Sequence, residues 1–144
     1  MNAGENALRV VRLTYPCDLE FLPLLNAVVE QCLGLTAADE DAACSVANAV
    51  LEAGTNAAQY GGGGNEVEVE VWVRPREIEI TVSDRGPGFD PQRVSRAGGS
   101  GGPMALRGRG IQIMTELMDE VRFENRPGGG TTVWLRKVFG NPAR

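Results

Sequence analysis

Residues 66–89 read EVEVEVWVRPREIEITVSDRGPGF, and this stretch decides the fold. From Glu66 to Val73, valine alternates with residues that are mostly glutamate. From Glu77 to Ser83 the alternation returns, and Arg74-Pro75-Arg76 separates the two runs. Successive side chains of a strand point to opposite faces of a sheet. The stretch therefore predicts a hairpin with one face on a core and the other nearer solvent.

The rest of the chain surrounds this hairpin with further strands and helices. Turn and cap residues predict helices from Asp18 to about Cys32, from Thr36–Asp39 to about Tyr60, and from about Gly108 to Met118. Further strands are expected at 8–15, 121–124 and 131–138. This order predicts an α+β two-layer sandwich, with a mixed, mostly antiparallel sheet and helices on one face. We expect a single domain over residues 1–144.

Composition excludes several classes of function. The chain has 144 residues, a net charge of −5 and no histidine, which removes Ser-His-Asp catalysis and histidine metal sites. The acidic balance argues against a nucleic-acid ligand. Three widely spaced cysteines lack a CxxC pair, and Lys137, the only lysine, follows no phosphate-binding loop. No apolar stretch is long enough to span a membrane, and a cytoplasmic protein is expected.

A polar stripe runs along the second expected helix. Asn48, Glu52, Asn56 and Tyr60 recur every four residues and so share one face. A carboxylate and an amide one turn apart can hold a hydrated Mg²⁺, or a water or hydroxyl, beside a phosphate. The alternative is an ordinary solvent-exposed face of an amphipathic helix.

A second cluster, Asp84-Arg85-Gly86-Pro87-Gly88-Phe89-Asp90, follows the hairpin directly. A buried carboxylate at a strand end can accept a hydrogen bond from an amino group such as that of adenine. Gly86 and Gly88 let the backbone approach a flat base closely. The alternative is an ordinary Asp-Gly turn.

A third cluster, Gly108-Arg109-Gly110, is expected to begin the last helix. N–H groups at a helix start, together with the helix dipole, favour an anion. Glycines at 98, 99, 101 and 102 stand just upstream, which suggests a flap that ends on a phosphate site.

In this order and spacing, the clusters resemble the nucleotide-binding boxes of GHKL ATPases, the Bergerat fold. The matching stretches are ExxxNA at 52–57, DRGPGF at 84–89, GRGIQIM at 108–114 and GGTTV at 129–133. Within that superfamily, the short chain and the glutamate four residues before the asparagine are similar to the anti-sigma serine kinases of bacterial partner-switching systems.

The resemblance assigns roles residue by residue. Glu52 matches the general base and Asn56 the Mg²⁺ ligand that also contacts the nucleotide. Asp84 matches the adenine-binding aspartate, and Thr131 the threonine that supports it through water. The glycines of the adenine and phosphate sites correspond to Gly86, Gly88, Gly108 and Gly110. A lid is expected at about 89–107, with Arg107 as its candidate cation.

The chain departs from the family pattern in three places. Gln59-Tyr60 and four glycines stand where a histidine is common, Arg109 lies between the two phosphate-site glycines, and the lid is rich in glycine.

The resemblance implies an ATP- and Mg²⁺-dependent serine/threonine protein kinase that is also an anti-sigma factor. Its substrate would be an anti-anti-sigma protein with a STAS domain, its second partner a sigma factor, and its assembly a homodimer in the bacterial cytoplasm. Two alternatives remain open. One is a nucleotide-binding anti-sigma or regulatory module without kinase activity, and the other is a histidine-kinase-type catalytic domain acting in trans.

Overall fold

The computed structural model describes residues 8–62, 65–86 and 102–140, and the side chains of 102–108 lie outside this description. Three α-helices, one short 3-10 helix and five strands occupy the described part of the chain. In order they are β1 (Arg9–Pro16), η2 (Leu19–Phe21), α1 (Leu22–Leu33), α2 (Glu40–Tyr60), β2 (Glu66–Arg74), β3 (Glu77–Ser83), α4 (Gly102–Leu117), β4 (Glu120–Asn125) and β5 (Thr131–Val138).

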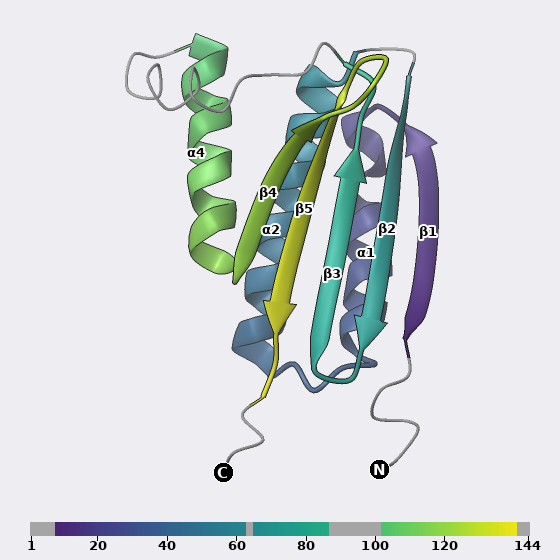
Figure 1. Ribbon diagram of the computed structural model, residues 1–144, viewed down its shortest axis with the longest axis vertical. Helices are drawn as coiled ribbons and strands as arrows, with labels where there is room; N and C mark the ends of the chain where they lie inside the picture. The colour runs from purple at the N-terminus through teal and green to yellow at the C-terminus, as the bar shows by residue number, and fades with distance from the viewer. Residues whose placement is uncertain (1–7, 63–64, 87–101, 141–144) are drawn as a thin grey trace.

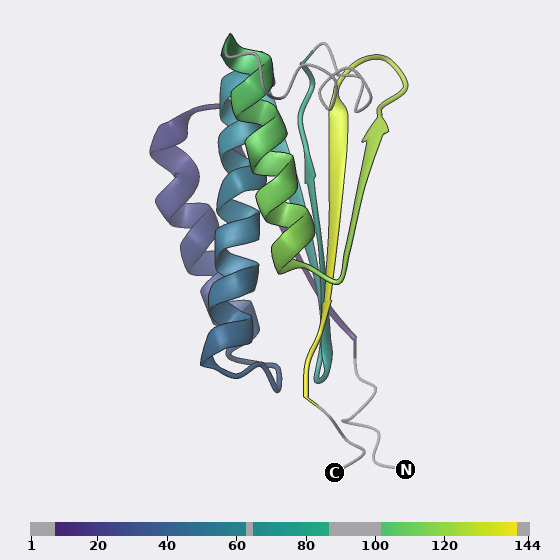
Figure 2. The ribbon, with the colours of Figure 1, turned by 90° about the vertical axis from the view of Figure 1, so that its left-hand side faces the viewer.

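The strands form one sheet in the order β1-β2-β3-β5-β4, and all four of its pairings are antiparallel. The helices cover one face of this sheet (Figures 1 and 2). The expected two-layer α+β architecture is therefore confirmed. The predicted hairpin is β2 and β3, in which Val71 lies opposite Ile80.

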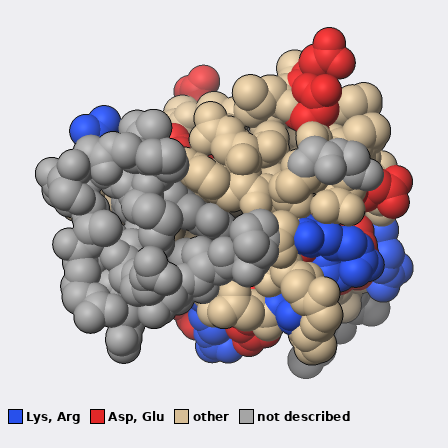
Figure 3. Space-filling view, turned by 90° about the horizontal axis from the view of Figure 1, so that it is seen from above, with Lys and Arg blue, Asp and Glu red and all other residues tan. Residues whose placement is uncertain are grey.

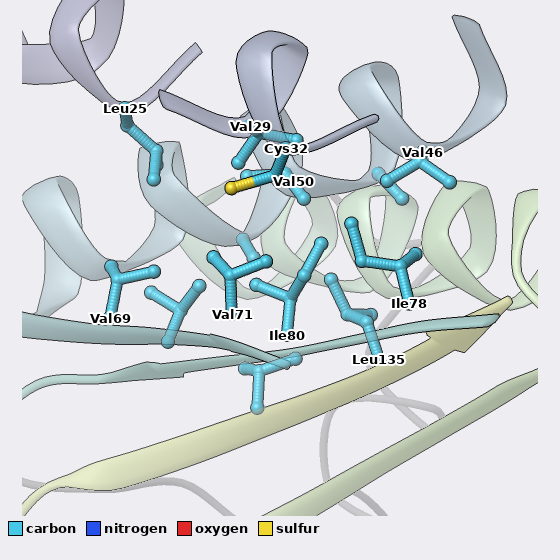
Figure 4. Close-up of a cluster of buried hydrophobic side chains, with 14 of the residues drawn as sticks. Leu25, Val29, Cys32, Val46, Val50, Val69, Val71, Ile78, Ile80 and Leu135 are labelled. Atoms are coloured by element: carbon cyan, nitrogen blue, oxygen red, sulfur yellow. The ribbon is translucent and has the colours of Figure 1, made fainter. Parts of the chain in front are cut away.

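The core lies between the inward face of the sheet and the helices. The inward-facing residues of β2 and β3 are all buried, whereas their neighbours along each strand are partly exposed. Figure 4 shows Leu25 and Val29 of α1 and Val46 and Val50 of α2 facing the apolar side chains of the strands. The alternation in the sequence thus fixes which face of the sheet carries the helices.

The long helix α2 begins where its sequence provides a cap. The Asp39 carboxylate accepts a hydrogen bond from the Ala42 backbone N–H at 2.8 Å, which satisfies one of the free donors at the helix start. Gly61 ends the helix, and its N–H donates to the Ala57 carbonyl. The first expected helix is instead divided into η2, capped by Asp18, and α1.

The expected start of the last helix is wrong. The helix was expected to begin at about Gly108, but α4 begins at Gly102, so Gly108 and Gly110 lie inside it. Pro103 suits the first turn of a helix, and Met, Ala, Leu and Arg follow it as good helix formers. These residues add little cost, and packing of α4 against α2 offsets the cost of about 1 kcal/mol for each internal glycine. Residues 102–107 of the expected lid are therefore helical, and 89–101 lie outside the described residues.

None of the helices in the described part of the chain is long and apolar enough to cross a membrane.

Shortening a core side chain tests this layered arrangement. Ile80 lies on central strand β3 with no exposed surface. We expect Ile80→Ala to lower the free energy of unfolding by about 2–5 kcal/mol, because it removes buried methyl groups and leaves a cavity. Thr81→Ala, on the opposite face of the same strand, should cost less than about 1 kcal/mol. Urea denaturation measures both, and equal losses would contradict the assignment of the two faces.

Candidate functional site

One end of the molecule brings together segments that are far apart in the sequence. The C-terminal end of α2, the end of β3 and the start of β5 all lie there, as Figure 1 shows. β3 pairs with β5 so that Ser83 lies opposite Thr132. The residues that follow β3 therefore lie beside those that begin β5. This brings Asp84 next to the GGTTV stretch at 129–133.

Asp84 is the buried acidic residue of this end, with 5% of its surface exposed. Its Oδ1 accepts hydrogen bonds from the backbone N–H of Gly86 at 2.9 Å and of Thr131 at 3.3 Å. Its own backbone N–H donates to the Thr131 carbonyl at 2.9 Å. Because both bonds from described residues end on Oδ1, the other carboxylate oxygen is left to accept a donor from a ligand.

Three glycines allow the chain segments to cross at Asp84. A Cβ at Gly130, which has a positive φ of 107°, would collide with the Asp84 carbonyl oxygen. A Cβ at Gly86 would collide with the carbonyl oxygen of Tyr60, and one at Gly61 would lie 2.9 Å from the Asp84 Cβ. Only a residue without a side chain fits at such positions. The glycines therefore set the position of the Asp84 carboxylate.

Thr131 provides an unsatisfied hydroxyl beside that carboxylate. The residue is 1% exposed, and its Oγ1 has no hydrogen-bond partner among the described residues. A buried hydroxyl without a partner costs free energy. A ligand or a water that bonds it would remove this cost, so Thr131 stays a candidate for ligand recognition.

The polar stripe of α2 lies under α4. Asn56 is buried, Glu52 is half-buried and Asn48 is exposed. A Cβ at Gly110 of α4 would lie 3.1 Å from Glu52 Oε2 and 3.3 Å from Asn56 Nδ2. Glu52 and Asn56 are thus not an exposed face of an amphipathic helix, because the backbone of a second helix approaches both.

The protonated thiol of Cys17 lies at the same end of the molecule as Asp84. The Sγ of Cys17 donates to the Ala57 carbonyl at 3.0 Å. Burial raises the pKa of this thiol, and the carboxylates of Asp84 and Asp18 raise it further. A protonated thiol can donate to a carbonyl, and a raised pKa keeps it protonated. Cys17 therefore stabilises the C-terminal turn of α2.

The structure brings most of the predicted site residues to this end. Asp84, Gly86 and Thr131 form one group, and Glu52, Asn56 and Gly110 form a second group along α2 and α4. Gly108 lies in α4, where backbone N–H groups bond to carbonyls one turn earlier instead of standing free at a helix start. Gly88 and the Arg107 side chain lie outside what the structure describes.

Sequence reasoning gave Gly61, Gly130 and Arg126 no individual role at the site. The run of three glycines before Thr131 signals a turn with positive φ and could have identified Gly130. Arg126 donates to the Asp84 carbonyl at 3.0 Å. No spacing rule in the sequence points to that contact, because 42 positions separate the two residues.

The chain is similar in sequence to known proteins. Residues 15–137 match the model of the histidine kinase-like ATPase domain. The chain is 37% identical over 94 residues to the anti-sigma F factor of Pasteuria penetrans, which covers 61% of this chain and 63% of that protein. It is 26% identical to the serine-protein kinase RsbW of Bacillus subtilis, over 94% of this chain and 89% of the relative.

Solved structures agree on the fold. The RsbU and RsbW domains of a Mycobacterium tuberculosis protein superpose with a TM-score of 0.68 at 19% identity, over 94% of this chain and 34% of the other. The SiaB–SiaC complex from Pseudomonas aeruginosa gives 0.60 at 17% identity, over 90% of this chain and 89% of the other.

Two glycines of one turn test the crossing at Asp84. Gly128 and Gly130 both have positive φ, but a Cβ at Gly128 would meet nothing within 4 Å. Gly128→Ala should therefore cost only the backbone strain, about 1–3 kcal/mol. Gly130→Ala adds a collision with the Asp84 carbonyl and should cost more in thermal unfolding. Equal losses of stability in the two variants would show that Gly130 is needed only for the positive φ of its turn and not for the crossing at Asp84.

Proposed function

The chain belongs to the family of histidine kinase-like ATPase domains, and on this premise we propose that it is an ATP-dependent protein kinase and anti-sigma factor. It binds ATP at the Asp84 end, phosphorylates a serine or threonine of an anti-anti-sigma protein with a STAS domain, and sequesters a sigma factor. The observation that carries the proposal is the buried Asp84 carboxylate, fixed by two backbone donors beside the unpaired Thr131 hydroxyl.

The donors and acceptors around Asp84 fit adenine. The free oxygen of the carboxylate accepts from the exocyclic amino group, and the Thr131 hydroxyl bonds a water that supports the base. Gly86, held by its N–H to Asp84, presents backbone without a side chain to the ring, and we assign the same role to Gly88. A site with a buried acceptor rejects an analogue that lacks the matching donor.

The second group fits the phosphate end. ATP supplies the phosphoryl group that is transferred. Glu52 orients the acceptor hydroxyl and takes its proton, and Asn56 holds Mg²⁺ through its amide oxygen. The described residues contain no cluster of three or more acidic, histidine or cysteine side chains for a metal. A magnesium ion here would be held by Asn56 together with the phosphates and water, as is usual for Mg²⁺ on nucleotides.

The glycines of α4 and the lid complete the proposed site. Gly110 lets the α4 backbone lie close to Glu52 and Asn56. We propose that Gly110 and Gly108 contact the triphosphate and that Arg107 is the lid cation. The closeness of Gly110 to the α2 pair supports this assignment.

The partners are inferred from the relatives. The similarity to anti-sigma F factors supports the proposed anti-sigma activity, and the similarity to the serine-protein kinase RsbW supports the proposed kinase activity. The chain covers only 63% of the Pasteuria relative, so sigma-factor binding is a proposal for this chain. We further propose a homodimer in the bacterial cytoplasm, with no nucleic-acid ligand, in keeping with the net charge of −5.

Two alternatives are distinguished by what the chain phosphorylates. A regulatory module would bind nucleotide and sigma factor but transfer nothing. A histidine-kinase-type domain would act on a histidine elsewhere, since these 144 residues contain none.

Removing the charge of Asp84 tests nucleotide binding. We expect micromolar affinity for ATP, on the order of −8 kcal/mol. Asp84→Asn should weaken it strongly, because a carboxamide is the poorer acceptor and leaves a buried group mispaired. Titration calorimetry with ATP measures the effect, and Asp41→Asn, an exposed change of the same charge, is the control. Unchanged affinity in Asp84→Asn would leave Asp84 as a turn residue.

The α2 pair tests phosphoryl transfer. Glu52→Gln should keep ATP and sigma-factor binding but lose roughly 10²-fold or more in transfer rate, because the base is removed and the site stays formed. Asn56→Ala should lose Mg-ATP affinity as well. Single-turnover transfer to a purified STAS partner, with Glu116→Gln as control, measures this. Transfer at the parental rate by Glu52→Gln would contradict its role. A parent that holds sigma factor but transfers nothing would favour the regulatory module.

A further inference from the structure

Arg126, in the turn between β4 and β5, contacts the backbone of Asp84 from the outer side of the sheet. Its Nη1 donates to the Asp84 carbonyl at 3.0 Å. Its backbone closes the turn at the same time, since its N–H donates to the Gly130 carbonyl at 2.8 Å and its carbonyl accepts from Gly129. One residue thus fixes both the turn that leads into Thr131 and the peptide that carries Asp84.

Glu68 of β2 holds the Arg126 side chain in place. Its Oε1 lies 3.4 Å from Nη2 of Arg126 and 3.2 Å from Nη2 of Arg85. The Arg126 side chain is 21% exposed, against 56% for Arg85. Seen from this end of the molecule, basic side chains form a group with acidic ones beside them (Figure 3). The planar guanidinium can reach two acceptors at once in a fixed geometry, which a lysine cannot do.

The consequence for recognition follows from the geometry of Asp84. Its carboxyl carbon is two bonds from the Cα next to the carbonyl that Arg126 holds. Its Oδ1 accepts a hydrogen bond from the N–H of Thr131, the residue after Gly130. Without Arg126, the Asp84 carbonyl loses its side-chain donor and the turn loses its link to the end of β3. The two sides of the base pocket could then shift relative to each other.

We propose that Arg126, anchored by Glu68, is a positioning residue that sets the selectivity of Asp84 for adenine. This inference rests on the proposed nucleotide site. Arg126 does not touch the base; it holds the carboxylate where only a purine with an amino group can satisfy it. Loss of Arg126 should therefore affect discrimination against a base that has a carbonyl in place of the amino group. It should affect binding of the phosphates less.

The test compares ATP with inosine triphosphate, which carries a carbonyl oxygen where adenine has its amino group. Arg126→Met should weaken ATP binding roughly tenfold, the size of one lost hydrogen bond to a charged donor. It should change inosine triphosphate binding less, so that the ratio of the two Kd values narrows. Arg126→Lys should restore part of the ratio, and Glu68→Gln should narrow it to a smaller extent.

Arg122→Met is the matched control. Arg122 is a β4 residue that loses the same charge, pairs with Glu120 and lies over the Trp134 ring. Arg122→Met should leave the ratio of the Kd values for ATP and inosine triphosphate unchanged. Thermal unfolding checks that every variant is folded. If Arg126→Met does not fold, Glu68→Gln and Arg126→Lys are used for the comparison instead.

The outcomes are separable from those of the proposed function. A parental ratio in folded Arg126→Met and Glu68→Gln overturns this inference and leaves the nucleotide site intact. An equal weakening of both nucleotides overturns it too, because it shows a merely structural role. A parent that binds neither nucleotide, or binds both equally, overturns the proposed role of Asp84 and the inference together.

Discussion

The pairing of β3 with β5 joins the two halves of the chain into one sheet, from Glu77 opposite Val138 to Ser83 opposite Thr132. The Asp84 group of the candidate site depends on this pairing. The pairing places the residues after β3 beside those before β5, and the Asp84 carboxylate then bonds the Thr131 N–H across the junction. The close approach requires glycine at 130, and the approach of the same loop to the end of α2 requires glycine at 86. A shift of the register by one residue would turn the inward-facing side chains of one of the two strands outward.

The helices add the second half of the site by packing on the same sheet. α2 buries its small and apolar side against the strands, so its polar stripe faces α4 and not the core. Gly110 then permits α4 to approach Glu52 and Asn56. The proposed base and metal ligand thus owe their place to helix packing, while the proposed adenine acceptor owes its place to strand pairing.

Most of the fold could be predicted from local sequence patterns. What could not be predicted depends on contacts between residues that are far apart in the sequence. The valine alternation identified β2 and β3 almost to their ends, and Asp39 marked the start of α2. The start of α4 was misplaced because Gly108-Arg109-Gly110 was interpreted as the helix start, although Pro103 and the residues after it favour a helix. Glu52, Asn56, Asp84 and Thr131 came from motifs. Arg126 could not, because an arginine in a polar turn carries no local signal for a carbonyl 42 positions away.

The bond between Asp84 and Thr131 spans 47 positions along the chain, and this has a consequence for how the domain folds. Contacts of such separation form only after the entropy of closing a long loop has been overcome. The proposed base pocket is therefore expected to form late, when the two hairpins join. A nucleotide bound at this proposed site would oppose separation of the hairpins as a whole, in proportion to the logarithm of its concentration.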